Sequence, residues 1–461
     1  MQSFSRKTAR EREVGTGLVQ DCAAVFDGAA AMHVRSVMEA EKALYRKIVW
    51  RIVPLAMLGY VIAYIDRINV GFAKLQFASD LGFSDAVYGV GAGLFFAGYF
   101  LLEVPSNMLM HRIGARSTFV RIMVLWGALT VGMAFVSSPM QFYVMRFLLG
   151  AAEAGFFPGI ILYFSYWFPE AIRGRVTSVF AMGASVAGLV GSPISSWLMS
   201  LDGLYGLRGW QILFLYEGLP AILLGFVCLF AVTDRPEQAS WLDAGEKALL
   251  ATRLAFDKRA KTDTGGGGPA DALKNPRVYL FALAYLSILA ATQAVALWTP
   301  SLLKNLHVST GTIGWLTSVP FLTAMICTFL LGRSSDRFGE RRWHFAAAIS
   351  VAGSALMLCG QLPSGVASIL VSMSLVASGA WAALGVFWTM PPALLSEKSR
   401  AVGIGVISSA GAIGGFVSPT IVGWSSTSLG SLFPGFAIIG AMLLLSAIVV
   451  LLAIKPGATA R

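Results

Sequence analysis

Charged residues are scarce in this sequence. Only 13% of its 461 residues are Asp, Glu, Lys or Arg, whereas soluble domains contain roughly 25%. Hydrophobic residues make up 56%, and the mean hydropathy is +0.70. So apolar a chain cannot cover its surface in water, and its composition also excludes a disordered or collagen-like chain. We therefore expect a protein that lies in lipid.

Cysteine and histidine are also sparse, with four of each. The cysteines form no C-x-x-C pair and have no histidine at metal-ligand spacing, so we expect neither a metal site nor a disulfide framework. The sequence contains no P-loop and no pairing of a nucleophile with a base, so we expect no cofactor and no enzyme. Residues 1–48 hold no apolar segment suited to a signal peptide.

Long apolar segments are abundant, and a helix needs about 20 such residues to cross a bilayer. The sequence predicts twelve spans, at residues 49–72, 86–110, 118–137, 141–166, 176–200, 212–233, 278–302, 311–331, 344–361, 365–390, 400–424 and 432–454.

The net charge of +11 comes from basic residues in short connections, which argues against nucleic-acid binding. With a cytoplasmic N-terminus, 28 of the 35 Lys and Arg residues fall on the cytoplasmic side. Three fall on the other side, namely Lys74, Arg208 and Lys304, and four lie within spans. This distribution predicts that both termini are cytoplasmic, in a cell (inner) membrane.

The longest connection, 234–277, is charged, contains four consecutive glycines and divides the spans six and six. A short surface helix is expected between 240 and 261. The predicted organisation is a largely disordered cytoplasmic segment (1–48), a six-helix bundle (49–233), a cytoplasmic linker (234–277), a second six-helix bundle (278–454) and a cytoplasmic tail (455–461).

The two halves repeat each other at a nearly constant offset. Gly89, Arg112 and Gly114 match Gly314, Arg337 and Gly339 at an offset of 225. Ser192-Pro193 matches Ser418-Pro419 at 226, and the pair Glu170/Arg173 matches Glu397/Arg400 at 227. This recurrence predicts two bundles related by duplication, with a central cavity between them.

The loop from Gly332 to Arg342, with Asp336-Arg337 and Gly339 in it, resembles a loop signature of the major facilitator superfamily. The segments Tyr64–Ala73, Glu103–Asn107 and Arg146–Gly159 are similar to the anion:cation symporter family, in its branch of tartrate, phthalate and hydroxyphenylacetate permeases. The resemblance implies an all-α membrane protein of twelve helices. In that family the residues matching Arg67 and Arg146 hold the anion, and the residue matching Glu153 carries the proton.

Charges within spans are costly and need a reason. Asp66 and Arg67 are adjacent in the first span, so they point about 100° apart and each needs another partner. Arg146 and Glu153 lie two helical turns apart on one face of the fourth span. We expect these four side chains to form one buried network; the alternative is a static ion network that only supports packing.

The chemistry of the four residues suggests roles. A guanidinium matches a carboxylate and stays charged when buried, so Arg67 and Arg146 are candidates to bind an anion. An anion that occupies an arginine would make the neighbouring carboxylate take up a proton more readily, so Asp66 and Glu153 are the candidate proton carriers.

Further candidates are weaker. Tyr99 matches a substrate-contacting tyrosine of the family, and Gln293, Trp388 and Thr389 are further substrate-binding candidates, each of which packing would also explain. A gating role is expected for Asp336, Arg337, Arg112, Glu170, Arg173, Glu397 and Arg400. His111 stands where the first-half loop signature has Asp, so an Asp–Arg latch can be complete only in the second half.

The sequence thus favours a monomeric, proton-coupled importer of a small organic carboxylate, such as a hydroxy, sugar or aromatic acid. Its partners are that anion, protons and membrane lipid. An exchanger or exporter on the same fold, and a transport-inactive nutrient sensor, remain as alternatives.

Overall fold

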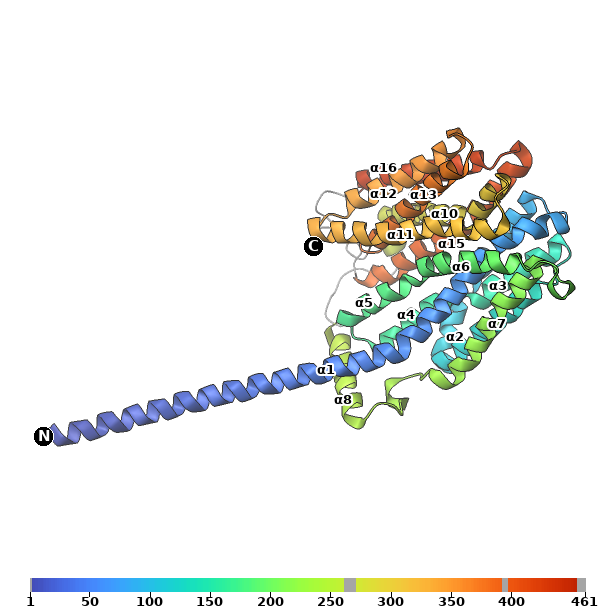
Figure 1. The fold of residues 1–461 in the computed structure, drawn as a ribbon. Coiled ribbons are helices and arrows are strands. Elements are labelled where there is room, and N and C mark those ends of the chain that lie inside the picture. The colour runs from blue at the N-terminus through green and yellow to red at the C-terminus, as the bar shows by residue number, and fades with distance from the viewer. Residues whose placement is uncertain (1, 261–270, 392–396, 454–461) are drawn as a thin grey trace.

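The computed structural model of the chain is almost entirely helical (Figure 1). It describes the backbone of residues 2–260, 271–391 and 397–453, and the side chains of residues 38–256, 272–391 and 402–452. The first half contains α1 (Gln2–Asp80), α2 (Asp85–Met133), α3 (Pro139–Glu153), α4 (Phe156–Trp167), α5 (Glu170–Ala181), α6 (Gly183–Met199), η1 (Leu204–Gly206) and α7 (Gly209–Ala231). The connection holds η2 (Pro236–Gln238), α8 (Ala244–Ala260) and α9 (Asp271–Lys274). The second half contains α10 (Pro276–Asn305), α11 (Thr310–Phe338), α12 (Arg342–Leu358), η3 (Cys359–Gln361), α13 (Val366–Phe387), α15 (Glu397–Leu429) and α16 (Phe433–Ala453).

Eleven helical segments of the described chain are long and apolar enough to span a bilayer. These eleven segments account for the twelve predicted spans, because α2 contains two of the predicted spans. As one straight helix its 49 residues would measure about 74 Å, more than twice the ~30 Å hydrocarbon core. The helical dihedrals are interrupted at Gly114, whose φ is 85°. The Asp234 carboxylate holds this point by accepting the Arg116 backbone N–H at 2.7 Å.

The start of α1 differs from the expected disordered segment at residues 1–48, because its backbone is helical from Gln2. Within the part whose side chains are described, Glu41 pairs with Arg253 and Lys47 with Glu246, each at 2.7 Å. Both partners lie on α8, which packs beside α1 (Figure 1). A hydropathy pattern does not detect such ion pairs, which extend the helix beyond its apolar part.

The two halves meet through equivalent residues of the repeat. Helix α2 packs on α15, and α6 packs on α11. A methyl group on Gly89 would overlap the Pro419 carbonyl, and one on Gly314 would lie 3.0 Å from Pro193. The sequence repeat pairs Gly89 with Gly314 and Pro193 with Pro419, so the two contacts are related in the way that a duplication predicts.

Polar contacts join the halves at one end of the bundle, which we call the closed end; it contains the connections 81–84, 306–309 and 430–432. Lys74 Nζ lies 2.9 Å from Asp85 and donates to Ser301 of the second half at 3.1 Å. Asp85 in turn accepts a hydrogen bond from Ser426 at 2.5 Å. Placing Lys74 in an external loop was wrong: it lies within α1 and is 7% exposed, because α1 continues past its apolar part to Asp80.

Candidate functional site

Arg67 of α1 and Glu153 of α3 form an ion pair. Arg67 Nε donates to Glu153 Oε1 at 2.7 Å, and a terminal nitrogen of the same guanidinium also contacts that oxygen. Glu153 is fully buried, whereas the Arg67 side chain keeps 17% exposure. The structure therefore brings together two of the four predicted network residues, with the arginine as the more accessible partner.

Glu153 lies at a break in the fourth predicted span. Helix α3 ends at Glu153, and α4 begins after Gly155, whose φ of 89° is left-handed. A side chain at Gly155 would also meet Ser106 at 2.6 Å, so glycine is required on both counts. The break fixes where the carboxylate sits relative to α1.

Asp66 does not form an ion pair with either arginine among the described contacts, in contrast to the expected network. Its Oδ1 accepts hydrogen bonds from Thr130 at 2.8 Å and from Asn69 at 3.1 Å. Asp66 is 1% exposed. Neutral donors of α1 and α2 thus bind Oδ1, whereas Oδ2 is buried without a described hydrogen-bond partner. Hydropathy patterns do not single out such donors.

Arg146 of α3 is 1% exposed. It interacts electrostatically with Asp66 and with Glu153. Its guanidinium stacks against Phe95, 4.9 Å from the ring centroid, while Nε and Nη1 have no hydrogen-bond partner. Buried guanidinium N–H groups are costly to leave unpaired, so Arg146 has donors available for an anion.

Aromatic rings border the same site. The Arg67 guanidinium lies 5.0 Å from the Tyr99 ring centroid and 5.6 Å from that of Phe95. The structure therefore places Tyr99 beside the predicted anion-binding arginine. Phe95, one turn earlier in α2, contacts both arginines and was not among the predicted residues.

The candidates of the second half lie on α10 and at the end of α13. Gln293 is buried in α10. Trp388 and Thr389 follow α13, and the Trp388 ring lies 4.9 Å from that of Tyr285. Tyr285 interacts electrostatically with Arg67, which links this cluster to the first-half site. Tyr285 was not among the predicted residues; its position two turns before Gln293 on an apolar helix was the available signal.

For four of the predicted gating residues, Asp336, Arg337, Arg112 and Arg173, no described contact joins the halves. Asp336 and Arg337 are exposed, and Asp336 lies 3.6 Å from Arg341 of its own loop. Arg112 is exposed at the Gly114 break, and Glu170 and Arg173 begin α5. The side chains of Glu397 and Arg400 lie outside the described residues. In this conformation the halves are joined at the closed end.

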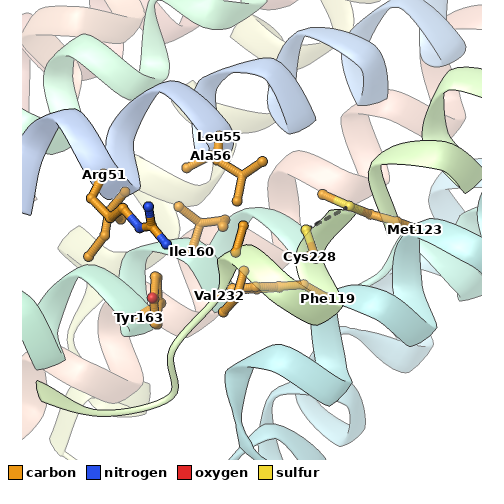
Figure 2. Close-up of a pocket in the computed structure, with 11 residues that line it drawn as sticks. Arg51, Leu55, Ala56, Phe119, Met123, Ile160, Tyr163, Cys228 and Val232 are labelled. Carbon is orange, nitrogen blue, oxygen red and sulfur yellow. Dashed lines mark hydrogen bonds between the residues drawn. The ribbon is translucent and has the colours of Figure 1, made fainter. Parts of the chain in front are cut away.

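A pocket of the first half lies elsewhere, between α1, α2, α4 and α7 (Figure 2). Arg51 stands on its α1 side, and apolar side chains such as Leu55, Ile160 and Val232 form most of its walls. Cys228 contacts the Met123 sulfur at 3.6 Å on its far side. None of the predicted site residues lines this pocket, and we base no binding site on it.

Comparison with known proteins relates this chain to one family of transporters. The model of the Major Facilitator Superfamily matches residues 56–304 and 280–461. A protein of Agrobacterium vitis named "Putative tartrate transporter" is 42% identical over 414 residues, which cover 90% of this chain and 92% of that protein. An Acinetobacter baumannii protein named "Quinolone resistance transporter" is 37% identical over 88% of this chain and 94% of that protein.

Among solved structures, a bacterial homologue of the human lysosomal transporter Spinster, in an inward-facing and unoccupied conformation, aligns with a TM-score of 0.69. The alignment covers 87% of this chain and 94% of that structure at 18% identity. At this identity the likeness concerns the fold alone.

Proposed function

Because the chain belongs to the Major Facilitator Superfamily, and is therefore a multi-pass membrane transport protein rather than an enzyme, we propose that it takes up a small organic carboxylate together with protons. The observation that carries the proposal is the Arg67–Glu153 pair beside Arg146, whose Nε and Nη1 have no partner. The Agrobacterium relative named for tartrate supports a carboxylate as substrate.

The first step of the proposed cycle is anion binding. A carboxylate that approaches Arg67 competes with Glu153 for the same guanidinium, and its second oxygen can accept from the free Arg146 donors. Two arginines then share the anion's charge, and Tyr99 lines the approach to Arg67. A mono- or dicarboxylate of the size of a hydroxy, sugar or aromatic acid suits two arginines and aromatic neighbours.

The second step is proton uptake. Once the anion engages Arg67, Glu153 loses its cationic partner while it remains fully buried. An unpaired buried carboxylate is unfavourable, so Glu153 takes up a proton. Anion and proton therefore favour each other's binding, which is the thermodynamic requirement of symport.

The third step is the change to the opposite conformation, in which the closed end opens and the other end closes. Contacts such as Lys74 with Ser301 and Asp85 with Ser426 hold the halves together there, and they must open for the opposite conformation. In that conformation we propose that Asp336 and Arg337, with Arg112 and the pairs Glu170/Arg173 and Glu397/Arg400, join the other end. We further propose a monomer in the inner membrane with both termini in the cytoplasm, as the distribution of basic residues indicates.

One relative favours a second candidate function. The Acinetobacter protein named for quinolone resistance makes export of an organic acid the alternative. In uptake by symport the proton moves in the same direction as the anion, whereas in export by antiport it moves in the opposite direction, so one experiment separates them.

That experiment uses the full-length protein in liposomes that contain a trapped pH dye, with pooled organic anions added outside. We expect anion-dependent internal acidification that is abolished in Glu153→Gln and in Arg67→Ala. Glu237→Gln, a change at an exposed carboxylate, is the matched control. Anion entry without acidification would overturn proton coupling, and the absence of any anion movement in either direction would overturn the proposed substrate class.

A further inference from the structure

Glu217 is a buried carboxylate that the proposed cycle does not use. It lies two turns into α7 and is 6% exposed. Its described partners are Ser195, Asn69 and Asp66, and none of them is a cation. A carboxylate at this depth requires either a cation or a proton.

The surroundings of Glu217 are polar but uncharged on one side. Ser195 of α6 donates to Glu217 Oε1 at 2.7 Å. On the other side stands the Asn69 amide, which interacts with Glu217 and donates to Asp66 Oδ1 at 3.1 Å. One amide thus separates two buried carboxyl groups, Glu217 on α7 and Asp66 on α1.

Three acceptors of this cluster lack a donor. Glu217 Oε2, Asn69 Oδ1 and Asp66 Oδ2 are buried and have no hydrogen-bond partner among the described residues. A buried acceptor without a donor is costly, and two ionised carboxylates on either side of one amide repel each other in a medium of low dielectric. One proton on Glu217 removes this repulsion and supplies a donor that Asn69 Oδ1 can accept, while Asn69 Nδ2 continues to donate to Asp66.

The Asn69 amide can form hydrogen bonds with both carboxyl groups whichever of the two carries the proton. Rotation by 180° exchanges its oxygen and nitrogen, so the amide then donates to Glu217 and accepts from a protonated Asp66. The described hydrogen bonds bias this choice. Asp66 Oδ1 accepts from both Thr130 and Asn69, whereas Glu217 Oε1 accepts from Ser195, so the contacts favour the proton on Glu217.

We propose that Glu217, Asn69 and Asp66 form a proton-binding site that holds one proton between its two carboxyl groups, separate from the Arg67–Glu153 pair. The groups that face it are Ser195 from α6, Thr130 from α2, and Arg146 and Glu153 from α3, the last two through electrostatic interaction with Asp66. Its use in transport rests on the proposed function, but the presence of the proton does not.

Infrared difference spectroscopy of the purified full-length protein tests this site without substrate. A protonated carboxyl group gives a C=O stretching band, which we expect in the wild type at neutral pH and expect to be lost in Glu217→Gln. Glutamine supplies an N–H to Asn69 Oδ1, so this variant should retain its thermal stability. Asp66→Asn should keep the band at a shifted position, and Glu237→Gln should leave it unchanged.

A band that persists unchanged in Glu217→Gln would overturn the assignment, and so would a band that disappears only in Asp66→Asn. Transport gives the second readout: in Glu217→Gln we expect retained counterflow and a displaced pH profile of uptake, whereas a purely structural glutamate would leave that profile in place. If the wild type shows the band but no anion-dependent acidification, symport is refuted and the proton site stands.

Discussion

Lys74 and Asp85 lie 2.9 Å apart at the closed end, and each also contacts the second half, Lys74 through Ser301 and Asp85 through Ser426. This ion pair is therefore shared between the halves. Its loss should cost about 1–3 kcal/mol, because a hydrogen bond that involves charge is broken at a largely buried position. About 1.4 kcal/mol suffices to change a conformational equilibrium tenfold.

Lys74→Met should therefore increase the population that is open at this end. Spin labels at Leu204 and Trp315, one on each half near the closed end, would report a longer distance in the variant. Lys304→Met is the matched control, since Lys304 is exposed at the same end. Equal distance distributions in Lys74→Met and the wild type would show that the pair does not hold the halves together.

Arg146→Met should change both the thermal stability of the ligand-free protein and the further stabilisation by a bound anion, and the two effects can be measured separately. The guanidinium interacts electrostatically with the buried Asp66 and Glu153, so its removal leaves these carboxylates less compensated and should lower the thermal midpoint of the ligand-free protein. A bound anion at 100 times its Kd stabilises the wild type by about 2.7 kcal/mol, and this gain should vanish in the variant. Tryptophan fluorescence during heating, with and without anion, measures both effects; an undiminished ligand shift would remove Arg146 from the binding site.

Gly314→Ala should disfavour the closed end, because a methyl group would lie 2.6 Å from the Ser192 carbonyl of the other half. Overpacking of this kind costs about 1–3 kcal/mol. Gly311→Ala, one turn earlier on α11, meets nothing within 4 Å and serves as the control. The same spin-label pair should show a longer distance in the first variant only, and a lengthening of similar size in both would point to the helix itself.

Glu340 lies outside the membrane spans, and we expect its carboxyl group to make the stability of the protein depend on pH. Burial raises the pKa of this carboxyl group, but hydrogen bonds from the Trp343 N–H, at 2.8 Å and 2.9 Å, and from His344 lower it further, so the net pKa lies below its usual value. A lowered folded-state pKa stabilises the protein above the unfolded-state pKa of about 4.3, and this contribution is lost as pH falls through the folded-state value.

Thermal midpoints measured from pH 7 down to acid conditions should therefore fall less steeply in Glu340→Gln than in the wild type. The difference at pH 7 should be small, about 0.5–1 kcal/mol, because the side chain is 35% exposed. Parallel midpoint curves for the two proteins would contradict this assignment.

Much of the architecture could be predicted from the sequence, because both hydropathy and the repeat are properties of the chain itself. The match of Gly89 with Gly314 and of Pro193 with Pro419 predicted a duplication, and these residues form equivalent contacts between the halves. The helix ends were harder to place. Lys74 was assigned to a loop because a hydropathy pattern records only apolar residues, whereas ion pairs and hydrogen bonds extend α1 further.

Part of the candidate site could be predicted from the sequence, and the reason is again which residue types give a visible signal. Charges within spans are conspicuous, so Arg67 and Glu153 could be proposed as partners, and the structure pairs them. Short polar residues are common and carry no such signal, so the bonds of Asp66 to Thr130 and Asn69 could not be anticipated. The depth of Glu217 depends on where α7 begins, which the sequence located only to within several residues.

Among the described side chains, the fully or nearly buried charged ones, Asp66, Lys74, Arg146, Glu153 and Glu217, all belong to the first half. Under the proposed function, the coupling of the substrate to its driving force resides in one half of the chain. The other half contributes Tyr285, Trp388 and their neighbours, which shape the space around the anion. Substitutions there can diverge toward a different acid without disturbing the coupling, so a second half grafted from a relative should change which acid is carried and preserve how its transport is driven.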